Sequence, residues 1–267
     1  MSSKPAAAAL AEIKRLVSAG FAEIVLCGTR LGMYKCPDSG TDLGGLMELL
    51  FGLQGGFRIR FSSLEPCEVS ERLAVILKSG GEKFCDYFHL PMQSGSAAVL
   101  KAMGRPYDPA GYLRKLRLLR KHFGDPGLYA DIIAGYPSET EGQFAETVSF
   151  VRQCGLAGLH VFRFSGRPGT KAYMLKPLSR KIVNERAAAL RALDAELRSA
   201  YAASMRGRVL RVLTLRNKDG GASGLASNFL QVGLQGAFRP GSIVEARITG
   251  VISGRAGCVC SGEALQR

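Results

Sequence analysis

The segment LYADIIAGYPSETE, residues 128–141, contains a strand pattern, a polar loop and the beginning of a helix pattern. Its first six residues form a short, largely apolar run of the length of a buried strand. Glycine and proline then mark a turn, and Ser138 to Glu141 supply the hydroxyl and acidic side chains that suit a helix N-terminus. The segment therefore predicts one βα unit of a parallel sheet.

The same alternation extends in both directions from this segment. Short apolar runs predict further strands at residues 22–27, 57–62, 85–90 and 159–164. Helical periodicity predicts helices at 6–19, 43–52, 68–79, 95–102, 109–122, 140–154 and 179–205. In the last of these helices it predicts Ile182 on the buried stripe and Arg186 off it. Strands that alternate with helices are typical of parallel sheets covered on both faces, so residues 1–206 are predicted to form one α/β domain.

The pattern changes after Gly207. Short alternating segments at 208–215, 224–226, 229–232, 243–248 and 257–260 are separated by turn signals such as Asp219-Gly220-Gly221. Short strands with frequent turns predict a small antiparallel barrel or meander. We therefore expect a second, all-β domain at residues 207–267.

Composition restricts the classes of partner. The 267 residues include 36 Lys and Arg against 22 Asp and Glu, a formal net charge of +14. Such an excess favours polyanions such as nucleic acid or an acidic membrane face. No run reaches the roughly 18 apolar residues of a membrane span, and the seven cysteines, several of them in apolar runs, predict buried free thiols in a reducing compartment. We expect a cytoplasmic protein without a membrane partner.

Polar residues follow every predicted strand of the α/β domain. In order, the strand ends lead into GTRLG (28–32), SSLEP (62–66), HLPMQSGS (89–96), DIIAGYPSETE (131–141) and FRFSGRPGT (162–170). Ligands of parallel α/β folds bind where strands end. Each string also has a structural explanation, since the glycines can serve turns, residues 138–141 can cap a helix, and His89 can be a hydrogen-bonded structural histidine. Cys258 and Cys260 have the wrong spacing for a zinc site, and no metal ligand is assigned.

Taken together and in order, these strings resemble the radical S-adenosylmethionine (SAM) methylthiotransferases over about residues 5–206. VLKAM (99–103) with Arg105 and Tyr107 adds to the match, and the tail from 207 resembles the RNA-binding TRAM domain of that family. The resemblance implies an incomplete (β/α)6 partial barrel of about five parallel strands, followed by a small TRAM-like β domain. SSLEP resembles the branch that acts on N6-threonylcarbamoyl-adenosine.

The resemblance also implies chemistry and site residues. Such enzymes add a 2-methylthio group to an adenosine beside the anticodon of tRNA, using SAM and 4Fe-4S clusters. The positions implied for SAM are Gly28, Thr29, Arg30, Gly32, Ser62, Ser63, Glu65, His89, Gln93, Ser94, Asp131, Gly135, Pro137 and Glu139. Those implied for the substrate entrance are Arg105, Arg163, Ser165 and Arg167. Basic stretches at 101–121 and 180–216 are expected to meet tRNA phosphates.

One feature of the family pattern is absent. The family holds its radical cluster with a CxxxCxxC loop, and none of the seven cysteines has that spacing. The first residues align after that loop, so we expect no cluster ligands, an exposed edge on the strand at 22–27, and an inactive isolated chain. The expected origin is a gene model started at an internal Met, or a split gene whose separately encoded N-terminal half supplies the clusters. The alternatives are the C-terminal subunit of a split enzyme, a non-catalytic RNA-binding remnant, and an unrelated barrel enzyme acting on a phosphorylated small molecule.

Overall fold

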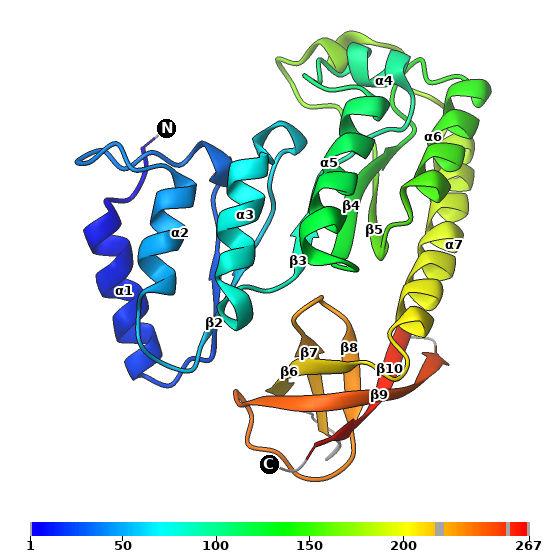
Figure 1. Ribbon diagram of the computed structural model, residues 1–267. Coiled ribbons are helices and arrows are strands. Elements are labelled where there is room, and N and C mark those ends of the chain that lie inside the picture. Colours follow the sequence, from blue (N-terminus) through cyan, green and yellow to red (C-terminus); the bar gives the residue numbers. More distant parts are fainter. Residues whose placement is uncertain (1, 217–221, 255–256, 266–267) are drawn as a thin grey trace.

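The computed structural model describes residues 2–216, 222–254 and 257–265. Figure 1 shows an α/β portion, a long helix α7 that runs along one side of it, and a small β barrel at the C-terminal end of that helix. The predicted turn at 219–221 lies outside the described residues. The division into two domains at residue 206 stays a prediction, although the change from α/β to all-β structure occurs there.

Five parallel strands form the α/β portion. They are β1 (Glu23–Leu26), β2 (Arg58–Phe61), β3 (Tyr87–His89), β4 (Gly127–Ala134) and β5 (Gly158–Arg163). β1 pairs with β2, and β3, β4 and β5 form a second sheet. The two sheets adjoin, since the Cys85 N–H donates to the Ile59 carbonyl at 2.9 Å and the Leu64 N–H to the His89 carbonyl at 3.0 Å. The predicted α/β class and its five parallel strands are confirmed.

Helices follow the strands as the periodicity predicts. They are α1 (Ala6–Ser18), α2 (Leu43–Phe51), α3 (Glu71–Ser79), α4 (Ala97–Ala102), α5 (Pro109–Phe123), α6 (Glu141–Cys154) and α7 (Arg180–Ser204). Short 3-10 turns lie at η1 (Leu31–Met33), η2 (Pro66–Glu68), η3 (Gly81–Lys83) and η4 (Lys171–Met174). Within the described residues no helix is long and apolar enough to cross a membrane.

The two faces of the sheets differ in polarity, because successive strand side chains point to opposite sides. On one face Ile59, Phe88 and Ile132 pack with helix residues such as Leu46 and Leu116 in a single apolar core. The other face carries charged and polar side chains: Glu23, Arg58, Arg60, His89 and Asp131. This polar face is the one on which a site can form. Within the described residues β1 pairs with β2 on one side only.

The C-terminal strands close into a barrel in the order β10-β8-β7-β6-β9. Their bounds are β6 (Val209–Leu215), β7 (Ala222–Ala226), β8 (Gln231–Leu234), β9 (Ile243–Gly254) and β10 (Gly257–Ala264). The barrel is predicted to be antiparallel, and that is wrong for one pair, because β8 and β10 run parallel. A closed sheet of five strands cannot alternate direction at every neighbour, so at least one pair has to be parallel.

Two buried arginines hold the barrel against the sheet. Arg58 donates to the carbonyl oxygens of Arg211 at 2.6 Å and Leu225 at 2.8 Å. Arg60 donates to the carbonyl oxygen of Ala226 at 3.1 Å. Both guanidinium groups also pair with Glu23, at 2.7 and 2.9 Å. The barrel therefore covers the part of the polar face that carries Glu23, Arg58 and Arg60, and this part cannot bind a ligand.

Two local expectations are wrong. On α7 the periodicity places Ile182 on the buried stripe and Arg186 off it, but Ile182 is exposed and Arg186 is buried, where it pairs with Glu139 and Glu141. Cys27 and Cys67 are exposed, whereas the thiols are predicted to be buried. Arg186 therefore does not belong to a solvent-facing basic surface.

Candidate functional site

The strand ends of β3, β4 and β5 border a cavity of about 770 Å³. This volume lies within the range of small-molecule sites, about 300–1,000 Å³. Its lining includes six of the predicted site residues: Gln93, Arg105, Asp131, Arg163, Ser165 and Arg167. Because parallel strands end at the same edge of a sheet, residues from three separate loops meet here.

The cavity is strongly cationic. The arginine and lysine side chains in its lining are Lys101, Arg105, Arg163, Arg167 and Lys171, and Asp131 is the one acidic residue that accompanies them. Lys101 and Lys171 are not among the predicted site residues. Apolar surface comes from Met103, Ile133 and Phe162. The arrangement suits a ligand that combines an apolar or aromatic part with an anionic group.

Asp131 joins two histidines on the neighbouring strands. The Nε2 atom of His89 lies 2.7 Å from Asp131 Oδ1, and the Nδ1 atom of His160 lies 3.3 Å from the same oxygen. The imidazole rings are perpendicular, with centroids 4.9 Å apart. Burial raises the pKa of Asp131, but hydrogen bonds from His160 and His89 and their positive charge outweigh it, so the pKa falls to about 2.

Strand register brings this cluster together. Asp131 of β4 pairs directly with His160 of β5, and His89 of β3 pairs with Tyr129, two residues before Asp131. The three side chains therefore share the polar face. His160 is not among the predicted site residues, because a single histidine inside the run GLHVFR gives no signal of its neighbours on other strands.

The segment after β3 is fixed by the backbone of Gln93. This residue has a left-handed φ of 69°; its N–H donates to the Asp131 carbonyl at 2.8 Å and its carbonyl accepts from Ile133 N–H at 2.9 Å. Gln93 thus extends the pairing beside β4 and lies at the cavity wall. Ser94 is buried and its hydroxyl lies 3.0 Å from the Thr147 hydroxyl of α6, so Ser94 anchors the loop to that helix.

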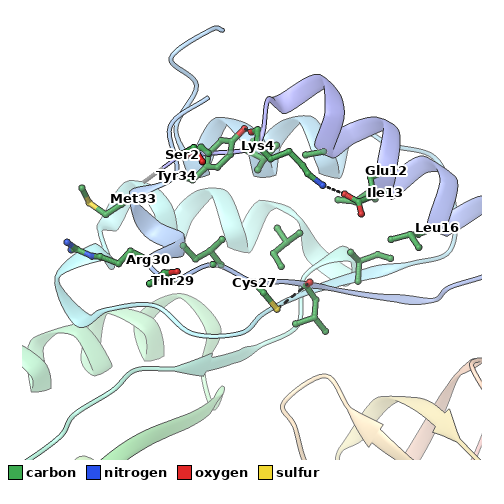
Figure 2. A pocket seen from close by; sticks show the side chains of 18 residues that line it. Ser2, Lys4, Glu12, Ile13, Leu16, Cys27, Thr29, Arg30, Met33 and Tyr34 are labelled. Carbon is green, nitrogen blue, oxygen red and sulfur yellow. Dashed lines mark hydrogen bonds and ion pairs between the residues drawn. The ribbon is translucent and has the colours of Figure 1, made fainter. Parts of the chain in front are cut away.

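A second cavity of about 600 Å³ lies between α1 and the end of β1. Gly28, Thr29 and Arg30 line it, so the structure separates these predicted residues from those around Asp131. Figure 2 shows Cys27 and Thr29 on the strand side, with Ile13 and Leu16 across from them on α1. The sequence-based site is therefore divided between two cavities on the same edge of the sheets.

Glu68 connects the loops after β1 and β2. Its Oε2 accepts hydrogen bonds from Gly32 N–H and Glu65 N–H, each at 3.1 Å, and its Oε1 accepts from Arg30 Nε at 3.3 Å. A Cβ on Gly32 would lie 2.4 Å from Glu68 Cβ, so glycine is required there. Glu68 is not predicted from the sequence, although its position three residues after Glu65 forms a capping box.

The remaining predicted residues lie at the margins of these cavities. Ser62 and Ser63 are half-buried, and the Ser62 N–H continues the β1–β2 pairing through the Leu26 carbonyl at 3.0 Å. Gly135 and Pro137 are buried in the loop before α6, and Gly135 lines a smaller pocket beside the start of α7.

The Glu139 carboxylate forms an ion pair with Arg186 of α7. Its Oε2 lies 2.7 Å from Arg186 Nη1, which also donates to the Glu139 carbonyl at 2.9 Å. Burial raises the pKa of Glu139, and the positive charge of Arg186 only partly offsets this. The structure places this carboxylate outside both larger cavities, so the direct role at SAM implied by the resemblance stays a prediction.

The described residues fit SAM and a 4Fe-4S cluster unequally. The cavity beside Asp131 has the volume and the polar groups for a molecule of the size of SAM. A cluster needs thiolates placed together, but in the described part of the chain no three cysteines lie within reach of one another. No step is therefore derived through a cluster on these residues.

Comparison with known proteins agrees with this architecture. The model of the radical SAM superfamily matches residues 2–151, more than half of the sequence. The chain belongs to the radical SAM superfamily. A solved radical SAM enzyme, coproporphyrinogen III oxidase from Escherichia coli, has the same fold with a TM-score of 0.53 and 15% identity, over 85% of this chain and 54% of that one.

Curated relatives of this radical SAM chain are named as tRNA methylthiotransferases. It is 32% identical to the threonylcarbamoyladenosine tRNA methylthiotransferase MtaB of Aquifex aeolicus, over 89% of this chain and 57% of the relative. It is 36% identical to the tRNA-2-methylthio-N(6)-dimethylallyladenosine synthase of Cereibacter sphaeroides, over 92% and 57%. The chain thus spans a little over half the length of these relatives.

Proposed function

We propose that this chain is the SAM-binding and tRNA-binding part of a radical SAM methylthiotransferase that modifies N6-threonylcarbamoyl-adenosine next to the anticodon. The observation that carries the proposal is the cationic cavity at the ends of β3, β4 and β5. SAM, when bound, supplies the methyl group and takes part in the radical chemistry. The residues of this chain bind and orient the nucleoside and its cosubstrate.

The charge of the cavity favours one of the two substrates named among the relatives. A threonylcarbamoyl group ends in a carboxylate, whereas a dimethylallyl group is a hydrocarbon. Arg163 at the end of β5, Arg167 in the loop after it and Arg105, whose Nη1 also lies 3.6 Å from Glu65 Oε1, line the cavity. Their planar guanidinium groups can bind a carboxylate through paired hydrogen bonds. Lining a pocket for a hydrocarbon with several cations would bring a desolvation cost without compensation.

The nucleoside base needs a different surface, and the same cavity offers it. Ile133 and Phe162 lie on β4 and β5 beside the cationic loop, and Tyr136 adds an aromatic ring whose hydroxyl donates to the Ala102 carbonyl at 3.0 Å. Apolar and aromatic contacts hold a purine. The proposal therefore assigns the base to the strand residues and the threonyl carboxylate to the arginines.

Loss of one modified nucleoside tests the substrate. Deleting the gene in the organism that makes the protein should abolish 2-methylthio-N6-threonylcarbamoyl-adenosine in total tRNA and leave the dimethylallyl counterpart unchanged, as measured by nucleoside mass spectrometry. Restoring the gene with Arg163→Glu should recover less than about a tenth of the product, since reversing one charge at a carboxylate-binding site costs more than about 1.4 kcal/mol.

Arg15→Glu is the matched control for this experiment. Arg15 is exposed on α1 and lines neither cavity, so restoring the gene with this variant should recover the product fully. Loss of the dimethylallyl product instead would transfer the assignment to the other substrate. Loss of neither would contradict the enzyme assignment and favour a non-catalytic RNA-binding role.

We also propose that the ligands of a 4Fe-4S cluster lie outside these 267 residues and that the 267 residues alone are inactive. Anaerobic reconstitution of the purified chain with iron and sulfide should yield much less than one 4Fe-4S cluster per chain by visible absorbance and iron analysis. The physical reason is that the described cysteines are dispersed. A full cluster on this chain would contradict this part of the proposal.

A further inference from the structure

We propose that His89, Asp131 and His160 form a binding site for one divalent transition-metal cation. This inference goes beyond the proposed function, which assigns no mononuclear metal. One potential ligand atom from each of the three residues lies within 4.8 Å of the other two. The nearest imidazole atoms already converge on a single carboxylate oxygen at 2.7 and 3.3 Å.

The donor set defines the class of cation. Two imidazoles and one carboxylate suit Zn²⁺, Fe²⁺ or Co²⁺, whereas Mg²⁺ and Ca²⁺ prefer sites made only of oxygen ligands. Three protein ligands leave at least one coordination position for water or substrate, as in catalytic zinc sites and in the two-histidine, one-carboxylate iron sites. This ligand set is therefore typical of a catalytic metal site with an open coordination position, and not of a structural site with four protein ligands.

The scaffold holds the three side chains in place. They project from three adjacent parallel strands whose register is fixed by continuous backbone pairing. The His160 ring also stacks on Tyr129, with centroids 6.2 Å apart and an interplanar angle of 29°. Ligands carried on strands are positioned more accurately than ligands on loops, so the small movements that coordination requires are confined to side-chain rotation.

The cluster is accessible from the cavity. The side chains of His89, Asp131 and His160 are 14%, 20% and 37% exposed, and Asp131 lines the 770 Å³ cavity. A cation can therefore reach the site, and its open coordination position would lie within reach of a bound anionic group. A purely structural hydrogen-bonded pair needs one imidazole for the carboxylate, whereas here two are directed at the same oxygen.

The third histidine of the sequence provides an internal contrast. His122 contacts one carboxylate, that of Glu71, at 2.8 Å, and the same carboxylate pairs with Lys121 at 2.9 Å. The positive charge of the Lys121 ammonium group beside Glu71 would repel a metal cation. A single imidazole beside this carboxylate also provides fewer ligand atoms than the two histidines at Asp131. His122→Ala is therefore a matched control for removal of a histidine from a carboxylate.

Cobalt titration tests the site directly. The full chain, freed of affinity tags and treated with a chelator, is titrated anaerobically with Co²⁺ and followed by visible d–d absorption, with Zn²⁺ as the competitor. We expect saturation at one equivalent and displacement by Zn²⁺. His160→Ala and Asp131→Asn should each weaken Co²⁺ binding by at least about tenfold, the effect reported even for outer-sphere residues, and His122→Ala should bind as the unmodified chain does.

Absence of saturable Co²⁺ absorption, or equal Co²⁺ binding by His160→Ala and the unmodified chain, would overturn the proposed metal site. Circular dichroism and thermal unfolding identify any variant that fails to fold, and Asp131→Asn then serves beside His160→Ala because it keeps the side-chain volume. The titration uses neither SAM nor tRNA, so its failure leaves the nucleoside experiment unaffected, and the reverse also holds.

Discussion

Replacing Glu23 with alanine is expected to lower the free energy of unfolding by about 3–5 kcal/mol, the cost of leaving a buried charge without its partner. Glu23 pairs with Arg58 Nε at 2.7 Å and Arg60 Nε at 2.9 Å, and the two arginine side chains are 0% and 3% exposed. The substitution leaves two buried guanidinium groups, between the sheet and the C-terminal barrel, without their carboxylate partner. Urea denaturation of the purified chain measures the change.

The matched control is Glu196→Ala. Glu196 pairs with Arg152 at 2.7 Å, but both side chains are 56% exposed, and exposed pairs contribute little. A Glu23→Ala variant no less stable than this control would contradict the assigned role of the buried network.

The same network predicts a pH dependence. Burial raises the pKa of Glu23, but hydrogen bonds and positive charge from Arg60 and Arg58 outweigh it, so the pKa in the folded state lies below its usual value. A lowered folded-state pKa gives stability that is complete above the unfolded-state pKa and is lost as the pH falls through the folded-state pKa. The stability difference between the unmodified chain and Glu23→Ala should therefore shrink on acidification below about pH 4.

Gly127→Ala is expected to have the second-largest effect on the free energy of unfolding. A Cβ at position 127 would lie 2.0 Å from the carbonyl oxygen of Asn228, which is backbone and cannot rotate away. Gly127 begins β4, and Asn228 lies in the turn between β7 and β8. Overpacking lowers the free energy of unfolding by about 1–3 kcal/mol. In this variant the added methyl group would push the barrel away from the sheet.

Thermal unfolding and limited proteolysis between α7 and β6 would detect this separation. Gly56→Ala is the control, since a Cβ there meets nothing within 4 Å and the change reduces only the entropy of the unfolded chain. Equal stability of Gly127→Ala and Gly56→Ala would show that the contact with Asn228 is dispensable.

The strands of the α/β portion were predictable because each is a short, mostly apolar run between turn signals. The predicted run 128–133 corresponds to β4, Gly127–Ala134. The burial of Arg186 was not predictable, because periodicity along α7 cannot reveal partners such as Glu139, which lies 47 residues away in the sequence. The parallel closure of the barrel was likewise hidden, since strand patterns carry no information on direction.

The candidate site shows the same limit. The principle that ligands gather at strand ends pointed to the strings at 89–96, 131–141 and 162–170, and the structure brings Gln93, Asp131 and Arg163 of these strings to one cavity. It could not show that Arg30 lines another cavity, because loops that leave the same edge can still turn in different directions. His160 escaped the sequence analysis because its significance depends on a pairing register that only the assembled sheet reveals.

Closure of the barrel by β10 has a consequence for biosynthesis. Because β10 pairs with both β8 and β9, the four strands before it can form at most an open sheet with two unpaired edges, and the ring cannot close until β10 has left the ribosome. Until β10 is in place, the unpaired edges of such a sheet are exposed and can pair with other chains, which favours aggregation. Nascent molecules halted shortly before that point would be expected to depend on chaperones.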